Sequence, residues 1–78
     1  MDLQITEKFY NNRSIIEKQY IKNEIFRDIY DDYLTCLKAQ RYWQKSRADE
    51  AASRRNEYVE LVSALEDELT QIIKNEKL

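Results

Sequence analysis

The most reactive side chain in this sequence is its single cysteine, Cys36. A reactive thiolate needs a nearby cation, a helix N-terminus or a histidine base. The chain has no histidine, and Cys36 stands between Tyr33 and Gln40 in an apolar row of helical spacing. We therefore interpret Cys36 as a small buried hydrophobic residue and not as a nucleophile.

Carboxylates at helical spacing are the second candidates for chemistry: Asp28 with Asp31 and Asp32, and Glu57 with Glu60. A di-iron bundle requires Glu together with Glu-x-x-His facing the core. That motif is absent, and these acids lie off the apolar rows. No glycine loop is present to approach a phosphate group. The sequence therefore predicts no catalytic residue, no metal and no cofactor, and we expect a protein that is not an enzyme.

Basic residues gather between positions 38 and 55, where six Lys and Arg residues accompany two acids. Arg54-Arg55 before a regular apolar run is similar to a basic-region zipper, but Asp49 and Glu50 would repel phosphate there. The sequence pI of 5.1 also disfavours nucleic acid as a partner. A nucleic-acid-associated regulator that uses this basic segment is kept as the alternative function, and a helical metal or ligand carrier as the second alternative.

Aromatic residues within the same segment suggest a protein contact. Tyr and Trp combine an apolar body with a polar tip, which suits protein interfaces. Two readings of Trp43 stay open: it plugs the end of a helix bundle, or it belongs to a docking patch. The candidate interaction patch comprises Arg41, Tyr42, Trp43, Lys45, Arg54 and Arg55.

The elements that position these residues are expected to be helices. The 78 residues include no Gly and no Pro, and strong helix formers fill the chain. No apolar run approaches the ~18 residues that cross a bilayer, and the N-terminus carries no basic segment before an apolar core. We expect a single all-α domain over residues 1–78, without a membrane segment, in a reducing, cytoplasmic setting.

Local signals divide that domain into three parts. Residues 1–13 are expected to form a short helix or an arm. Ser14 and Glu17 have the spacing of a capping box, which predicts a helix over 14–46. A turn near 45–50 would lead into a helix over 49–75, giving a long antiparallel, coiled-coil-like hairpin. One continuous helix is the competing interpretation, and it would leave two apolar bands in water.

The apolar rows of the two long helices define the expected core or oligomer seam. In the first helix the row alternates steps of four and three, beside a second row through Ile25, Ile29, Cys36 and Trp43. In the second helix the run is strictly 4-3-4-3. The seam residues are Phe26, Tyr30, Tyr33, Leu37, Tyr58, Val62, Leu65, Leu69 and Ile72.

Charge and size together favour oligomerisation. A chain this short buries only about 60% of its unfolded surface, and one Cys with no His excludes an intrachain disulfide and most zinc sites. Folding near residue 48 gives a basic tip and an acidic open end, which complement each other in an antiparallel pair. We predict a homodimeric four-helix bundle, with a different protein as the competing partner. The expected function is a non-catalytic protein–protein interaction module: an adaptor, regulator or chaperone-like subunit.

Overall fold

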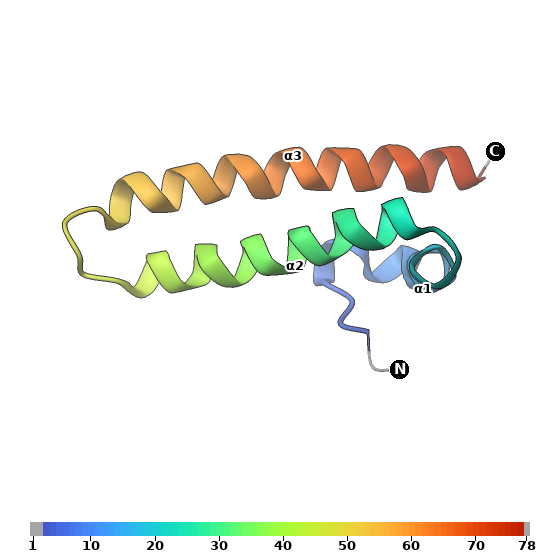
Figure 1. Ribbon diagram of the computed structural model, residues 1–78, viewed down its shortest axis with the longest axis horizontal. Coiled ribbons are helices and arrows are strands. Elements are labelled where there is room, and N and C mark those ends of the chain that lie inside the picture. Colours follow the sequence, from blue (N-terminus) through green and yellow to red (C-terminus); the bar gives the residue numbers. More distant parts are fainter. Residues whose placement is uncertain (1–2, 78) are drawn as a thin grey trace.

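The computed structural model describes residues 3–77, and these residues are helical apart from short connections. No strand occurs among them. The long helices α2 and α3 run antiparallel and pack against each other along their length (Figure 1). The elements in chain order are a 3-10 helix η1 (Glu7–Asn12), α1 (Arg13–Lys22), α2 (Glu24–Lys45) and α3 (Ala51–Lys77).

The chain reverses direction in a short loop, residues 46–50, which we call the tip. Ser46 has an extended backbone, with φ −77° and ψ 144°, and this ends α2. The Ser46 Oγ accepts a hydrogen bond of 3.2 Å from the Ala48 amide, and the Ala51 amide donates to the Ala48 carbonyl at 3.0 Å. Hydrogen bonds of this kind stabilise a turn without glycine. The chain therefore takes the hairpin path and not that of one continuous helix.

The single helix expected over 14–46 is two helices, which corrects the sequence-based prediction. The helix breaks at Asn23, whose φ of −121° and ψ of 104° are extended. Its side-chain Oδ1 accepts a hydrogen bond of 3.1 Å from the Phe26 amide, so Asn23 is the N-cap of α2. The Arg27 guanidinium donates to the carbonyls of Tyr20 and Ile21 at the exposed end of α1. These bonds replace the helical ones lost at the break.

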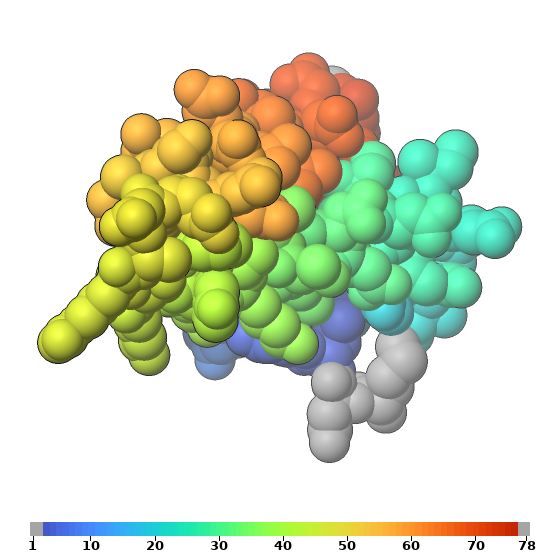
Figure 2. Space-filling view, turned by 60° about the vertical axis from the view of Figure 1, so that its left-hand side comes forward, coloured from blue at the N-terminus to red at the C-terminus, as the bar shows by residue number. Residues whose placement is uncertain are grey.

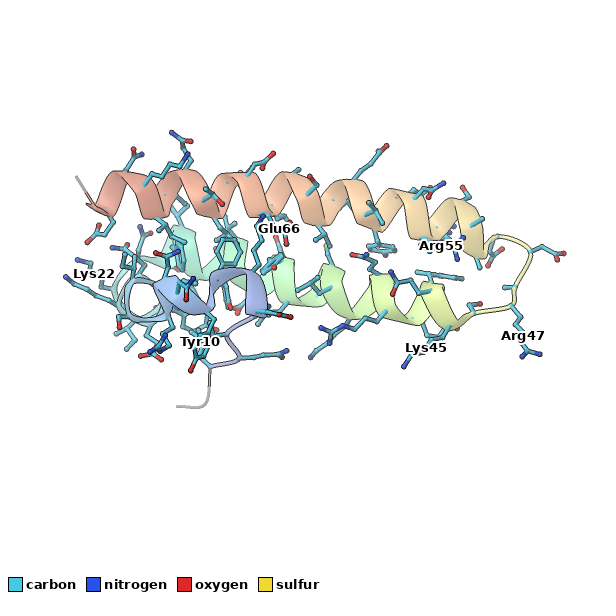
Figure 3. All side chains as sticks on the ribbon, turned by 180° about the vertical axis from the view of Figure 1, so that it is seen from behind. Tyr10, Lys22, Lys45, Arg47, Arg55 and Glu66 are labelled. Carbon is cyan, nitrogen blue, oxygen red and sulfur yellow. The ribbon has the colours of Figure 1, made fainter. Side chains whose placement is uncertain are left out.

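Within residues 3–12 the expected short helix is present, but it is the 3-10 helix η1 and not an α-helix. Residues 3–6 are irregular and lead into η1; together, residues 3–12 are called the strap. The strap lies behind α2 in Figure 1 and in front of it in Figure 3. Ser14 is exposed within the first turn of α1, and the N-cap position is taken by Asn12, which makes no side-chain cap hydrogen bond. The expected Ser14 cap is therefore wrong.

The core lies in the half of the molecule furthest from the tip. There the strap, α1, α2 and α3 meet, whereas nearer the tip only α2 and α3 are present (Figure 1). Phe26, Tyr30 and Ile16 have no exposed surface. Burial of such side chains contributes roughly 1.5–3 kcal/mol each. The buried apolar cluster comprises Phe9, Ile16, Phe26, Tyr30, Tyr33, Val62, Leu69 and Ile73.

Candidate functional site

One side of the hairpin carries an apolar surface that runs along both long helices. On α2, Ile25, Ile29, Cys36 and Trp43 are spaced by four, seven and seven residues, so they share one side of the helix. On α3 the corresponding side carries Tyr58, Leu61, Leu65 and Ile72. These eight residues are called the apolar face.

Part of the apolar face is accessible to solvent. Ile25 is 72% exposed and Leu61 is 49% exposed, and its other six members are partly buried. Figure 1 looks onto the hairpin from the side opposite the strap, and no part of residues 3–77 lies over α2 and α3 there. In Figure 2 the strap, in blue, shows only beneath α2. Hydrophobic residues on one uncovered face of a small protein typically mark an interaction site.

Cys36 lies in the middle of this apolar face. It is partly buried and packs against the core, as expected for a small hydrophobic residue. Burial raises the pKa of the Cys36 thiol, and the nearby negative charge of Asp32 raises that pKa further. Both effects disfavour the thiolate, so the environment of Cys36 opposes nucleophilic reactivity.

The residues predicted as a seam divide between the core and its edge. Phe26, Tyr30, Tyr33, Val62 and Leu69 are buried. The remaining four, Leu37, Tyr58, Leu65 and Ile72, are partly buried. Ile73, which the strict 4-3-4-3 run leaves out, is 3% exposed because the additional elements near the open end cover it as well. Sequence periodicity alone cannot reveal such an additional layer.

The candidate patch at the tip is split between different sides of the hairpin. Trp43 belongs to the apolar face, and Arg54 lies beside that face because it precedes Leu61 by seven residues. Arg41 follows Leu37 by four residues, and Arg55 precedes Val59 by four; these lie towards the strap side. The structure therefore does not bring the six patch residues onto a single surface.

Two aromatic residues near the C-terminal end of α2 are in contact with each other. The rings of Tyr42 and Trp43 meet edge to face, with centroids 5.0 Å apart. Trp43 is partly buried, whereas Tyr42 is 64% exposed. Arg54 forms an exposed ion pair with Glu57, with Nη1 and Oε2 3.3 Å apart. Such pairs contribute about 0–1 kcal/mol, so Arg54 is easily diverted to another partner.

A polar network that the sequence did not indicate joins the strap to both long helices. The Tyr33 hydroxyl donates to Glu66 Oε2 at 3.0 Å and lies 3.2 Å from Thr6 Oγ1. The Tyr30 hydroxyl donates to the Gln4 carbonyl at 2.7 Å. Burial, opposed by the Thr6 hydrogen bond and reinforced by Glu66, raises the pKa of Tyr33 to about 12. Burial raises the pKa of Tyr30 as well.

These hydroxyls hold the strap in place and are not placed for acid–base chemistry. A phenol with a pKa near 12 does not ionise at neutral pH. Within residues 3–77 no group of three or more acidic, Cys or His side chains is arranged to bind a metal ion. The same residues include no helix that is both long and apolar enough to cross a membrane. Comparison of the chain with protein-family models, curated proteins and solved structures finds no match.

Proposed function

We propose that this protein is a non-catalytic protein–protein interaction module that pairs with a second copy through the apolar face. Two hairpins joined in this way form a four-helix bundle with coiled-coil-like packing. The observation that carries the proposal is the apolar face itself, with Ile25 72% and Leu61 49% exposed. Covering this face would bury the second row of apolar residues, which a lone hairpin leaves partly in water.

The size of the chain supports a partner of this kind. A domain of 78 residues buries only about 60% of its unfolded surface, so association commonly provides the missing stability. Isologous pairing is the commonest way in which soluble proteins associate. A second copy also matches the apolar face in length, because its own apolar face runs along the same two helices, α2 and α3.

The charges beside the apolar face favour antiparallel pairing. Asp28, Asp32 and Glu68 are exposed near the open end, whereas Arg47 and Arg54 lie at or near the tip. Parallel pairing would bring the acidic groups of the two copies together. Antiparallel pairing brings each acidic end to the partner's residues 38–55, which include six basic and two acidic side chains, so opposite charges meet across the interface.

Light scattering behind size exclusion tests the pairing. The chain has a mass of 9.5 kDa, and the dimer is expected at twice this mass over a wide range of concentration. Leu61→Glu places a charge in the interface and should give the monomer mass with the helices retained. Val59→Glu is the matched control, because Val59 is 43% exposed on the same helix but lies outside the apolar face. A folded wild-type monomer at micromolar concentration would refute the pairing.

Cys36 reports on whether two copies meet through the apolar face, and a second cysteine position reports on their orientation. It stands close to the midpoint of α2 (Glu24–Lys45), where an antiparallel two-fold axis brings a residue near its own copy. Diamide, a two-electron oxidant, should therefore link the two Cys36 thiols in a disulfide and take up their two protons and two electrons. Parallel hairpins would place Cys36 near its own copy too, so Ile25→Cys in a Cys36→Ser background is the control. It should crosslink only if the pairing is parallel. We expect the pair to act in a reducing, cytoplasmic setting, where Cys36 remains a thiol.

A further inference from the structure

The side of the hairpin opposite the apolar face is only half covered by the strap. One stripe of α2 runs through Tyr30, Leu34, Leu37 and Arg41 at steps of four, three and four. The strap contacts this stripe at Tyr30, whose hydroxyl binds the Gln4 carbonyl. In Figure 3, which shows this side, the strap lies over the half of α2 that is distant from the tip and stops before the half that leads to Lys45.

The matching stripe of α3 has the same organisation. It runs through Glu66, Val62, Val59 and Arg55, again at steps of four, three and four. Glu66 lies at the covered end, because it receives the hydrogen bond from Tyr33 beside the strap. Val59 is 43% exposed, and Arg55 is partly buried. We call Leu37, Arg41, Lys45, Arg55 and Val59 the basic face.

The basic face is apolar at its centre and carries only positive charge around it. Leu37 is partly buried against the core cluster, while Arg41 and Lys45 are exposed. The charged residues of α2 from Leu37 to Lys45 are Lys38, Arg41 and Lys45, and all three are basic. Glu66, the acidic residue at the covered end, is already engaged by the Tyr33 hydroxyl. Arg54 is paired with Glu57 on α3, whereas the basic face has no acidic residue on either stripe beside Arg41 and Arg55.

We infer that the basic face binds an acidic amphipathic helix from another protein. The strap shows what packs on this side of the hairpin: η1 places Phe9 against Tyr33, with the rings edge to face and centroids 5.6 Å apart, and Phe9 is only 3% exposed. A partner helix would continue this layer towards the tip, setting an apolar residue on Leu37 and Val59. Its carboxylates would meet Arg41, Lys45 and Arg55.

An acidic helix fits this surface better than a nucleic acid does. A phosphate backbone would use the charges but would leave Leu37 and Val59 against a polar chain, where they gain nothing. Single-stranded nucleic acids bind aromatic rings on which bases can stack, and the five residues of the basic face include no aromatic one. Both the apolar centre and the charged rim match an amphipathic helix.

This site is distinct from the pairing surface proposed above. The basic face lies on the strap side of α2 and α3, and the apolar face lies on the opposite side. A dimer would therefore carry two basic faces, and each could be filled without disturbing the pair. Loss of the dimer and loss of helix binding are separate results, because the first is measured as mass and the second as binding of a labelled peptide.

The test uses a fluorescein-labelled helical peptide of about 18 residues, ~27 Å long, with one leucine stripe flanked by glutamates. Fluorescence anisotropy should show binding that weakens as salt is added. The double variant Arg41→Glu/Arg55→Glu should lower the affinity about tenfold or more, because each change replaces attraction with repulsion. Lys18→Glu/Lys74→Glu is the matched control. Both lysines are exposed on other surfaces, and the affinity should change less than about twofold.

Two further probes separate charge from shape. The same peptide with lysines in place of its glutamates should not bind, and a single-stranded RNA of equal charge should bind more weakly than the acidic peptide. Val59→Ser tests the apolar centre without a change of charge and should also weaken binding. Equal affinity for wild type and the Arg41→Glu/Arg55→Glu variant would overturn the proposal, as would tighter binding of the RNA. Circular dichroism of each variant confirms that the helices are intact.

Discussion

The hydroxyl of Tyr33 donates a 3.0 Å hydrogen bond to the carboxylate of Glu66, 33 residues further along the chain. Thr6 Oγ1 lies 3.2 Å from the same hydroxyl. Because the Tyr33 proton is given to Glu66, the Thr6 hydroxyl is left to donate to Tyr33. One phenol thus joins the strap, α2 and α3, in a side chain that is only 1% exposed.

Removing that phenolic hydroxyl should destabilise the fold. Tyr33→Phe leaves Glu66 and Thr6 without their shared partner, and we expect a loss on the order of 1–2 kcal/mol in the free energy of unfolding. Urea denaturation followed by circular dichroism measures it. Tyr42→Phe is the matched control: Tyr42 is 64% exposed, so its hydroxyl should contribute nothing detectable. Equal effects of the two variants would show that the network is not a stabilising one.

Stability should fall at high pH because of Tyr33. The pKa of this phenol is raised from 10.0 to about 12 in the folded protein, so between these values the unfolded state loses a proton that the folded state retains. The stabilisation is therefore complete below pH 10 and is lost as the pH approaches 12. Urea midpoints at about pH 9 and about pH 11 should fall further in wild type than in Tyr33→Phe, where this titration is absent.

The cap at the α1–α2 break should be measurable by itself. Asn23→Ala removes the oxygen that accepts from the Phe26 amide at 3.1 Å, and the expected cost is about 0.5–2 kcal/mol. Asn56→Ala is the control, since Asn56 is exposed within α3 and alanine is the better helix former there. Thermal unfolding of both variants separates the cap from the general effect of losing an asparagine. No difference between them would contradict the capping role.

Two leucines on α3 should respond in opposite ways. Leu69 has no exposed surface, so Leu69→Ala should cost about 2–5 kcal/mol by leaving a cavity in the core. Leu61 is 49% exposed, and Leu61→Ala should change the stability of a dilute monomer by less than about 1 kcal/mol. At higher concentration Leu61→Ala should instead weaken pairing. Denaturation at two protein concentrations, with scattering mass alongside, distinguishes these effects.

The sequence was sufficient for the helical class, the position of the turn and most core positions on α2. Those predictions rest on the absence of glycine and proline and on the wide apolar band of α2. Both features can be recognised within a single helix, without knowledge of how the helices pack. Asn23 was missed because the helix expected from Ser14 meets no Gly or Pro before Ser46, so no break was predicted within it. The signal that indicates it is Asn23 directly before Glu24 and the apolar row that begins at Phe26, because Asn is a favoured N-cap and an acidic residue is favoured in the first turn of a helix.

The strap and the division of the tip patch could not be predicted in the same way. The packing of residues 3–12 depends on Tyr30 and Tyr33, which lie some 26 residues away from their strap partners. Sequence periodicity does not indicate contacts between residues so far apart in the chain. The patch residues Arg54 and Arg55 are neighbours in sequence, but consecutive residues on a helix point about 100° apart. Their nearness in sequence therefore predicted a shared surface, whereas in the fold the two side chains lie on different sides of α3.

The core of this protein lies at the end of the hairpin where α1 and the last turns of α3 are found (Figure 1). Lys22 and Glu76 approach to 4.0 Å there, although most of the chain separates them. Contacts next to the turn are easily formed but bury little, while the contacts that bury most require closure of the longest loops. Folding therefore cannot be completed by zipping from the turn. We therefore expect the C-terminal turns of α3, which carry the buried Leu69 and Ile73, to influence the rate of folding more than the turn does.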